Sequence, residues 1–121
     1  PRSTLFPYTT LFRSFAELIT KYPNMNAVFV SNDQMALGVL HYARAHGICI
    51  PDALAVVGFD NLAESPYFTP ALTTVEQPLR ELGSLAVRTL LEQVDSSGES
   101  VPFQDITLQT RLVVRDSTPR D

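Results

Sequence analysis

The chain has 121 residues, of which 45% are hydrophobic and 18% charged, a composition typical of one globular domain rather than a disordered chain. A formal net charge of -4 and a pI of about 5.0 argue against a nucleic-acid-binding surface, because phosphates are neutralised by clustered lysine and arginine. No apolar run approaches the ~18 residues of a membrane-spanning helix. The lone cysteine, Cys49, excludes an internal disulfide framework. Because it lies between two isoleucines, we predict a buried thiol, which fits a cytoplasmic protein.

Residues 1–14 differ in pattern from the rest of the chain. They have neither helical nor strand periodicity and no acidic residue, and the run TLFPYTTLFRS, from Thr4 to Ser14, resembles the translation of a common sequencing-adapter oligonucleotide. We therefore predict that residues 1–14 are an artefactual or non-native leader, comparable to a tag. A natural basic and aromatic arm is the alternative. The domain then spans residues 15–117, with a tail at 118–121, and the chain is a truncated fragment of a longer protein.

The first elements predicted after this leader are a helix and a strand. Residues 15–21 place Phe15, Leu18 and Ile19 on one helical face, so they predict the end of a helix. Residues 27–30 then form an apolar run without alternation, which is typical of a strand that helices cover on both faces.

A second helix is predicted after Asn32, and Gly47 supplies its end. Its buried stripe should consist of the apolar residues at helical spacing, which are Met35, Ala36, Val39, Leu40 and Ala43. An apolar strand at residues 55–57 follows, so residues 27–60 form one βαβ unit. Parallel strands joined by a right-handed crossover end at the same edge of the sheet, where open α/β sheets bind ligands. Asn32 and Asp60 should therefore lie near each other and face a crevice.

Beyond this unit the sequence predicts a loop, a strand, a helix and an edge strand. Residues 61–70 hold two prolines and two adjacent aromatics, Tyr67 and Phe68, which is more apolar surface than a solvated loop needs. Residues 72–75 predict a short strand. A helix then begins at Gln77 and Pro78 and ends at residues 96–98, with an apolar stripe of Leu79, Leu82, Ala86, Leu90 and Val94. Residues 106–114 alternate like a half-buried strand near a sheet edge, and residues 117–121 predict a frayed tail.

The motifs that carry chemistry point away from catalysis. No serine lies in a G-x-S-x-G elbow, no Cys, His and Asp set has metal-ligand spacing, and no glycine-rich loop is suited to hold phosphates. His46, just before Gly47, fits a favourable group at a helix C-terminus, and His41 is expected to be exposed. We therefore predict a protein that is not an enzyme, with no metal and no cofactor.

What remains is a polar pair, Asn32 and Asp60, each at the exit of a predicted strand. A carboxylate accepts hydrogen bonds, and an amide both donates and accepts them, which suits a ligand with several hydroxyl groups. Both residues also have ordinary structural uses, because Asn32 can cap its helix and Asp60 can form a local turn. From the residues alone, both interpretations stay open.

Leu37 is an apolar residue outside the buried stripe of its helix. At 100° per residue it falls on a flank shared with His41 and Arg44. This position indicates either a contact with something outside the domain or a singly exposed leucine, which is common in globular proteins.

Three ordered motifs carry a family resemblance. SNDQMALGVL, VVGFDN and PALTTVEQP, at residues 31–40, 56–61 and 70–78, resemble the effector-binding core of the lactose/galactose-repressor family of bacterial transcription regulators. The resemblance implies an α/β fold with a type I periplasmic-binding-protein-like parallel sheet flanked by helices. In that family a sugar or nucleobase binds between two subdomains. A helix-turn-helix headpiece, which this sequence lacks, binds operator DNA as a dimer.

Carried over residue by residue, the resemblance implies that Asn32 and Asp60 contact effector hydroxyls and that Gln77 lies at a crossover on the cleft edge. It also implies a surface that pairs two subunits, at Leu37, Tyr67 and Phe68. The expected function is the ligand-sensing part of a cytoplasmic transcriptional repressor. The expected small-molecule effector is a sugar or related polyol, and the parent protein is expected to be a homodimer. Operator DNA would be bound only through the missing headpiece, and no membrane partner is expected.

Two other interpretations stay open. The periplasmic sugar-binding protein of an ABC transporter shares the fold, although TTVEQP and the helix-forming NDQMALG segment favour the regulator. An upstream helix-turn-helix would support the regulator, whereas a secretory leader would support the transporter component. In the third interpretation, this polypeptide alone has no function because it lacks half of its cleft, and it aggregates or swaps strands through uncovered edges.

Overall fold

The computed structural model describes residues 7–95 and 105–119. The chain divides into two compact units, Pro1–Glu76 with Leu112–Asp121, and Gln77–Arg111. The first is called the sheet unit and the second the helix unit.

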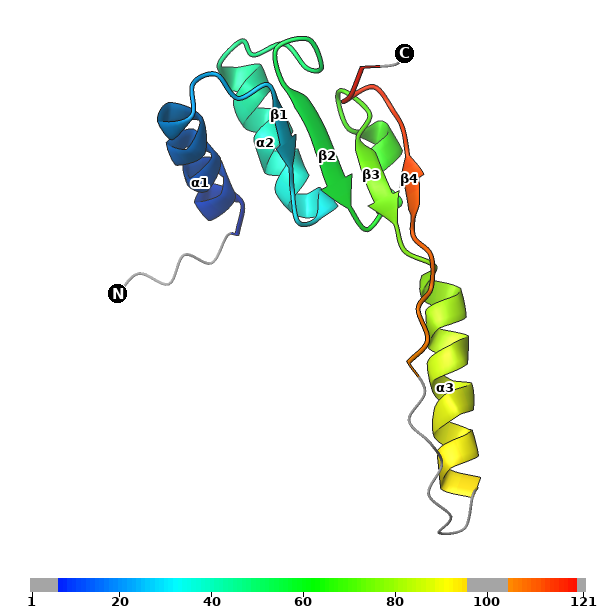
Figure 1. Cartoon of the computed structure of the whole chain (residues 1–121). Helices are drawn as coiled ribbons and strands as arrows, with labels where there is room; N and C mark the ends of the chain where they lie inside the picture. The colour runs from blue at the N-terminus through cyan, green and yellow to red at the C-terminus, as the bar shows by residue number, and fades with distance from the viewer. Residues whose placement is uncertain (1–6, 96–104, 120–121) are drawn as a thin grey trace, which may run out of the picture. The chain divides into compact units, whose positions relative to one another are not determined.

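The sheet unit is a layered α/β structure (Figure 1). Its strands are ordered β1-β2-β3-β4, and β1 pairs with β2 and β2 with β3 in parallel. The register sets Val28 opposite Val56 and Gly58 opposite Thr74. In chain order the elements are α1 (Pro7–Lys21), β1 (Ala27–Phe29), α2 (Asp33–Ala45), β2 (Ala55–Phe59), the 3-10 turn η1 (Ser65–Tyr67), β3 (Thr73–Glu76) and β4 (Arg111–Val113), which begins at the boundary between the units. The predicted α/β class, the βαβ unit and the mainly parallel sheet are confirmed.

The α2 helix forms where its sequence pattern predicts it. Asn32 caps its first turn, Asp33 places a negative charge at the positive end of the helix dipole, and Gly47 follows its end with a φ of 67°. The predicted stripe is confirmed, since Ala36, Val39, Leu40 and Ala43 are buried and Met35 packs against the core.

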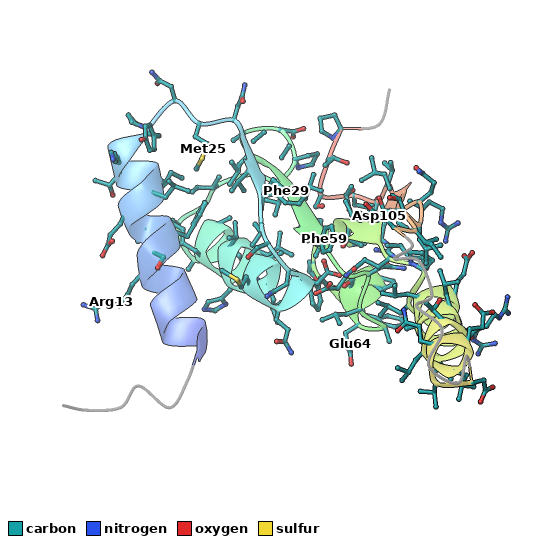
Figure 2. The ribbon with its side chains drawn as sticks, turned by 60° about the horizontal axis from the view of Figure 1, so that its bottom comes forward. Arg13, Met25, Phe29, Phe59, Glu64 and Asp105 are labelled. Atoms are coloured by element: carbon teal, nitrogen blue, oxygen red, sulfur yellow. The ribbon has the colours of Figure 1, made fainter. Side chains whose placement is uncertain are left out.

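The core lies between the two helices and one face of the sheet. Its buried members come from α1, α2 and the strand segments, and are Phe15, Val30, Ala36, Val39, Leu40, Leu54, Val56 and Leu72. The expectation that β1 is covered on both faces is wrong, because Phe29 exposes 62% of its surface. Alternate residues of a strand point to opposite faces, and α1 and α2 lie over the face that carries Val56. Phe29 and Phe59 lie together on the other face, with ring centroids 6.4 Å apart (Figure 2).

The α1 helix begins at Pro7, so the expectation of no helical structure in this part of the leader is wrong for Pro7 onward. Phe12 lies three residues before Phe15 and continues the same helical face, which accounts for the longer helix. Its ring lies 4.9 Å from that of Tyr42, and the Phe15 ring lies 5.3 Å from the same tyrosine. Residues 1–6 lie outside the described part. The artefactual origin of the leader is untested and stays a prediction.

Cys49 is exposed, so the prediction of a buried thiol is wrong. It lies in the loop between α2 and β2, where the flanking Ile48 and Ile50 pack against the core. Its own side chain points elsewhere, while its carbonyl accepts hydrogen bonds from the backbone of Ala53 and Leu54. Two apolar neighbours therefore fill the core contact that was predicted for the cysteine.

The C-terminal segment differs from its prediction in two ways. The β4 strand covers only Arg111–Val113 rather than residues 106–114, because its neighbour β3 has only four residues to pair with. The prediction of a frayed tail at residues 117–121 is wrong at its first residue, because Ser117 is fully buried. Its hydroxyl donates to the Val56 carbonyl at 2.6 Å and accepts from the Thr73 N–H at 2.8 Å. Residues 120–121 lie outside the described part.

The helix unit contains α3 (Leu79–Asp95), which confirms the predicted helix, although it begins at Leu79 rather than at Gln77 and Pro78. None of its residues is buried. The predicted apolar stripe lies open, with Leu79 58%, Leu90 59% and Val94 69% exposed. Beside it, Ile106 joins Leu82 and neighbouring α3 residues in lining a shallow groove. The predicted helix end at residues 96–98 lies outside the described part.

Candidate functional site

Asn32 and Asp60 lie at the carboxyl edge of the sheet, as predicted from the βαβ pattern. The register pairs Phe29 of β1 with Val57 of β2. Asn32 lies three residues after Phe29, and Asp60 lies three residues after Val57. Both are half-buried. The two side chains therefore belong to equivalent turns on neighbouring parallel strands, at the edge where open α/β sheets bind ligands.

Asn32 has the capping role that the sequence left open. Its Oδ1 accepts a hydrogen bond from the Met35 N–H at 2.8 Å, and its backbone carbonyl accepts from the Ala36 N–H at 3.0 Å. The cap engages the side-chain oxygen. The amide group of the same side chain carries two N–H donors besides, so capping and ligand binding are compatible in one residue.

Asp60 begins a tight left-handed turn. Its φ is 108° and that of Asn61 is 52°, both in the region that asparagine, aspartate and glycine tolerate best. The Asp60 N–H donates to the Val75 carbonyl at 2.9 Å, so its backbone is tied to β3. Asp60 thus forms a local turn, as the structural interpretation proposed, and its carboxylate is carried at a fixed place on the sheet edge.

The turn after β2 is held by Asp33, a fully buried carboxylate. Its Oδ2 accepts hydrogen bonds from the Leu62 N–H at 2.9 Å and from the Ser65 hydroxyl. Its Oδ1 accepts from the Thr74 hydroxyl at 2.6 Å. A buried charge needs such partners, because an unpaired one is costly to remove from water. Asp33 therefore joins α2, the turn after β2, and β3.

Gly58 provides the space for this carboxylate. A Cβ built on Gly58 would overlap Asp33 Oδ1 and lie 2.9 Å from Leu72 Cδ2. Any side chain at this position of β2 would displace the buried acid. The glycine in the VVGFDN motif is therefore needed for a close approach rather than for an unusual backbone angle.

Asn61, next to Asp60, bonds two charged side chains. Its Nδ2 donates to Glu76 Oε1 at 3.2 Å, and its Oδ1 accepts from Arg115 Nη2 at 2.7 Å. The Arg115 Nη1 donates to the Leu72 carbonyl at 2.7 Å, and its backbone N–H donates to Thr73 Oγ1, also at 2.7 Å. The Asp60 turn is thereby linked to both ends of β3 and to the segment after β4.

The remaining candidate residues lie apart from this edge or in the other unit. Gln77 is half-buried and is the first residue of the helix unit. Leu37 is 37% exposed and Tyr67 85% exposed, which fits the expected outward position of both. Phe68 differs, because it is half-buried and packs against the core, so the expectation of an exposed aromatic pair is wrong for it. The chain turns outward at Tyr67 and inward at Phe68 as η1 ends.

Sequence reasoning missed Asp33, Asn61 and Arg115 as members of the site. The sequence pattern indicates no role in the site for any of these three residues. Their partners lie 13 to 54 residues away along the chain, where periodicity carries no signal. Two left-handed residues in the FDN sequence were the one local hint, since aspartate and asparagine are enriched in that conformation.

Within residues 7–95 and 105–119, no group of three or more His, Cys, Asp or Glu residues is arranged to hold a metal ion. Every helix in those ranges is too short or too polar to cross a membrane.

Comparisons with known proteins agree with this architecture. A family model described as a periplasmic binding protein-like domain matches residues 5–118. The NTD biosynthesis operon regulator NtdR of Bacillus subtilis is 37% identical over 107 residues, which are 88% of this chain and 32% of that protein. The chain spans about a third of the length of this relative.

Solved structures give the same result. The transcriptional regulator CelR in its cellobiose complex matches with a TM-score of 0.82 and 33% identity, over 93% of this chain and 34% of that one. The lac repressor dimer bound to operator and the anti-inducer ONPF matches with a TM-score of 0.78 and 33% identity, over 91% of this chain and 37% of that one. These proteins are transcriptional regulators by name, not enzymes.

Proposed function

Because the chain belongs to the periplasmic binding protein-like domain family and matches LacI-family regulators, we propose that it is part of the effector-sensing core of a DNA-binding transcriptional regulator. We use "parent protein" for the longer gene product that would contain this segment. The proposed effector is a sugar or related polyol, bound through Asn32 and Asp60. The chain itself is proposed to be neither an enzyme nor a metal or cofactor protein.

One observation carries this proposal. Asn32 and Asp60 occupy equivalent turns, three residues beyond paired positions of neighbouring parallel strands. A carboxylate and an amide at such an edge can accept from and donate to adjacent hydroxyl groups of one ligand. The match to a regulator solved with cellobiose supports a hydroxyl-rich effector.

The helix unit supports a site completed by further chain. None of the α3 residues is buried, and its leucines and valines, apart from the half-buried Leu85, are about half exposed or more. An open apolar stripe of this length is unusual for a finished surface. We expect it to pack in a second subdomain of the parent protein, with Gln77, the first residue of the helix unit, at the edge of the cleft between the subdomains.

The proposed mechanism is a shift between two arrangements of the parent protein. An effector bound at Asp60 and Asn32 favours a closed cleft, which changes how a headpiece outside this chain binds operator DNA. An effector shifts such an equilibrium only by its differential affinity for the two states, typically ~1–3 kcal/mol of coupling. This regulation would take place in the cytoplasm, where the DNA is.

The parent protein is proposed to be a homodimer through a surface that includes Leu37, Tyr67 and Phe68. Leu37 and Tyr67 are exposed apolar residues, which supports a contact outside the domain. Phe68 would support the same surface from beneath, since it packs on the core behind it.

The alternative function, the periplasmic component of an ABC transporter, shares the fold, but the matched relatives are named as transcriptional regulators, which supports the regulator over it. Recovering the complete reading frame at the locus tests both functions. A helix-turn-helix upstream of residue 15 supports the regulator, whereas a secretory leader in its place contradicts it and supports the transporter component. The same sequence tests the leader, because an upstream frame without the codons of residues 4–14 is expected.

The isolated 121-residue chain is proposed to bind no sugar, because it holds one side of the cleft. Its β1 edge and the exposed Phe29 are expected to promote aggregation or strand swapping. Analytical ultracentrifugation and calorimetry with sugars test this. A monomer that binds sugar at micromolar concentration would contradict the proposal.

A further inference from the structure

The two chain connections between the units approach one hydrogen-bonded cluster of the sheet unit. The chain leaves the sheet unit after Glu76 and returns to it at Leu112. Glu76 is the last residue before the first connection, and Arg115 lies three residues after the second. Both side chains are half-buried, and both bond to Asn61.

The Asn61 amide is chemically matched to this double contact. Its oxygen accepts from the Arg115 guanidinium at 2.7 Å, and its nitrogen donates to the Glu76 carboxylate at 3.2 Å. An aspartate at this position could only accept, and a glycine would offer no side-chain group. The φ of 52° at Asn61 is one that asparagine and glycine adopt readily, so the backbone turn does not depend on the amide.

Asn61 is also fixed on its other side. Its N–H lies 3.3 Å from Thr74 Oγ1, and that hydroxyl donates to the buried Asp33 carboxylate at 2.6 Å. Asp33 follows Asn32 and Asn61 follows Asp60, so both candidate effector residues adjoin members of one hydrogen-bonded cluster. The cluster therefore runs from the candidate effector residues to both connections.

We propose that Asn61 is a positioning residue that couples the effector at Asp60 to the two connections between the units, through Glu76 on one and Arg115 on the other. This inference rests on the proposed function. When a ligand engages the Asp60 carboxylate, the adjoining Asn61 holds Glu76 and Arg115 in one arrangement, and with them the chain segments that lead into the helix unit. Coupling between two binding sites is reciprocal, so it can be measured from either side.

The test uses the parent protein, a DNA duplex that it selects from a random pool, and a panel of cellobiose, ribose and glucose. The sugar that binds the unaltered protein most tightly serves as the probe. Its affinity is measured by calorimetry with and without the DNA, and the ratio of the two affinities reports the coupling. For the unaltered protein a ratio of about 5 to 150 is expected.

Asn61→Gly removes both side-chain bonds and keeps the backbone conformation. It should still bind the sugar, but the ratio should fall to within about twofold of one, because the sugar no longer acts on the connections. Asn61→Asp keeps an acceptor for Arg115 but sets a second carboxylate against Glu76, so its ratio should also fall. Glu64→Ala is the matched control. Glu64 is exposed in the same loop, extends away from the ribbon in Figure 2 and makes no side-chain capping bond, so its ratio should not change.

A merely structural role would lower the melting temperature of Asn61→Gly and leave the ratio of affinities at its unaltered value. That result would overturn the coupling role while the proposed function stands. An unchanged ratio in Asn61→Asp would overturn the part assigned to Glu76. If the unaltered parent protein binds no sugar of the panel, the proposed function fails, and this inference fails with it.

Discussion

The Asp33 carboxylate accepts a hydrogen bond from the Thr74 hydroxyl at 2.6 Å, across 41 residues of sequence. This bond joins the first residue of α2 to β3. The α2 helix follows β1, and β2 lies between β1 and β3 in the sheet. The same carboxylate holds the Leu62 N–H and the Ser65 hydroxyl. One buried side chain thus fixes the turn that carries Asp60 to the body of the sheet.

Asp33→Ala is expected to lower the stability of the parent protein strongly. The substitution leaves two buried hydroxyls and one backbone N–H without their acceptor, so a loss of about 3 kcal/mol or more is expected. Urea unfolding measures it. Gln34→Ala, on the exposed neighbouring position of the same helix turn, should change stability by less than about 0.5 kcal/mol. Equal effects of the two substitutions would show that the Asp33 network contributes little.

Two glycine substitutions should change the stability of the fold in opposite directions. Gly58→Ala places a methyl group against the Asp33 carboxylate and Leu72, so it should destabilise by about 1–3 kcal/mol or more. In the isolated chain, Gly83→Ala, within α3, meets nothing within 4 Å and should stabilise by about 0.5–1 kcal/mol, because alanine is the better helix former. Thermal unfolding of both variants decides this. A neutral Gly58→Ala would contradict the close packing around the carboxylate.

Ser117→Ala tests whether the end of the chain belongs to the fold. The substitution leaves the buried Thr73 N–H without its acceptor and the Val56 carbonyl without a donor, at an expected cost of about 1–3 kcal/mol. Ser84→Ala makes the same chemical change at an exposed position of α3 and should be neutral or slightly stabilising. Hydrogen exchange at Thr73 should speed up only in the first variant. An unchanged rate of hydrogen exchange at Thr73 would show that Ser117 belongs to a frayed tail.

The sequence predicts elements well where apolar spacing alone decides them. The α2 stripe at Ala36, Val39 and Leu40 is an example, as are the parallel strands on either side of this helix. It does not predict Asp33 or Ser117 as buried, because polar residues are buried only by virtue of partners that folding brings in from far along the chain. The prediction of a buried Cys49 is wrong for a related reason, because composition cannot say which of three adjacent apolar residues faces inward in a loop.

For the candidate site, the sequence predicts which edge carries it but not how it is braced. The βαβ pattern places Asn32 and Asp60 at one edge of the sheet, and the register agrees. The bonds from Asn61 to Glu76 and Arg115 depend on side-chain geometry between segments that are distant along the chain. No spacing rule reports such bonds.

Leu37→Asp in the parent protein should shift its sedimentation toward the monomer. The substitution would bury a charge at the proposed subunit contact, where desolvation is costly. Gln34→Asp adds the same charge to an exposed position in the first turn of α2, and it should leave the dimer intact. A stable dimer in both variants would make Leu37 a singly exposed leucine.

The most direct measurement is the release of operator DNA by sugar in an Asp60→Gly variant of the parent protein. Glycine accepts the φ of 108° at this position, so the variant removes the carboxylate without straining the turn. Fluorescence anisotropy of a labelled DNA duplex, selected by the unaltered protein, follows binding and release with the same sugar panel. Unaltered DNA binding with no release by sugar is the predicted result. Release at the same sugar concentration as in the unaltered protein would contradict the account, because Asp60 would then lie outside the effector site.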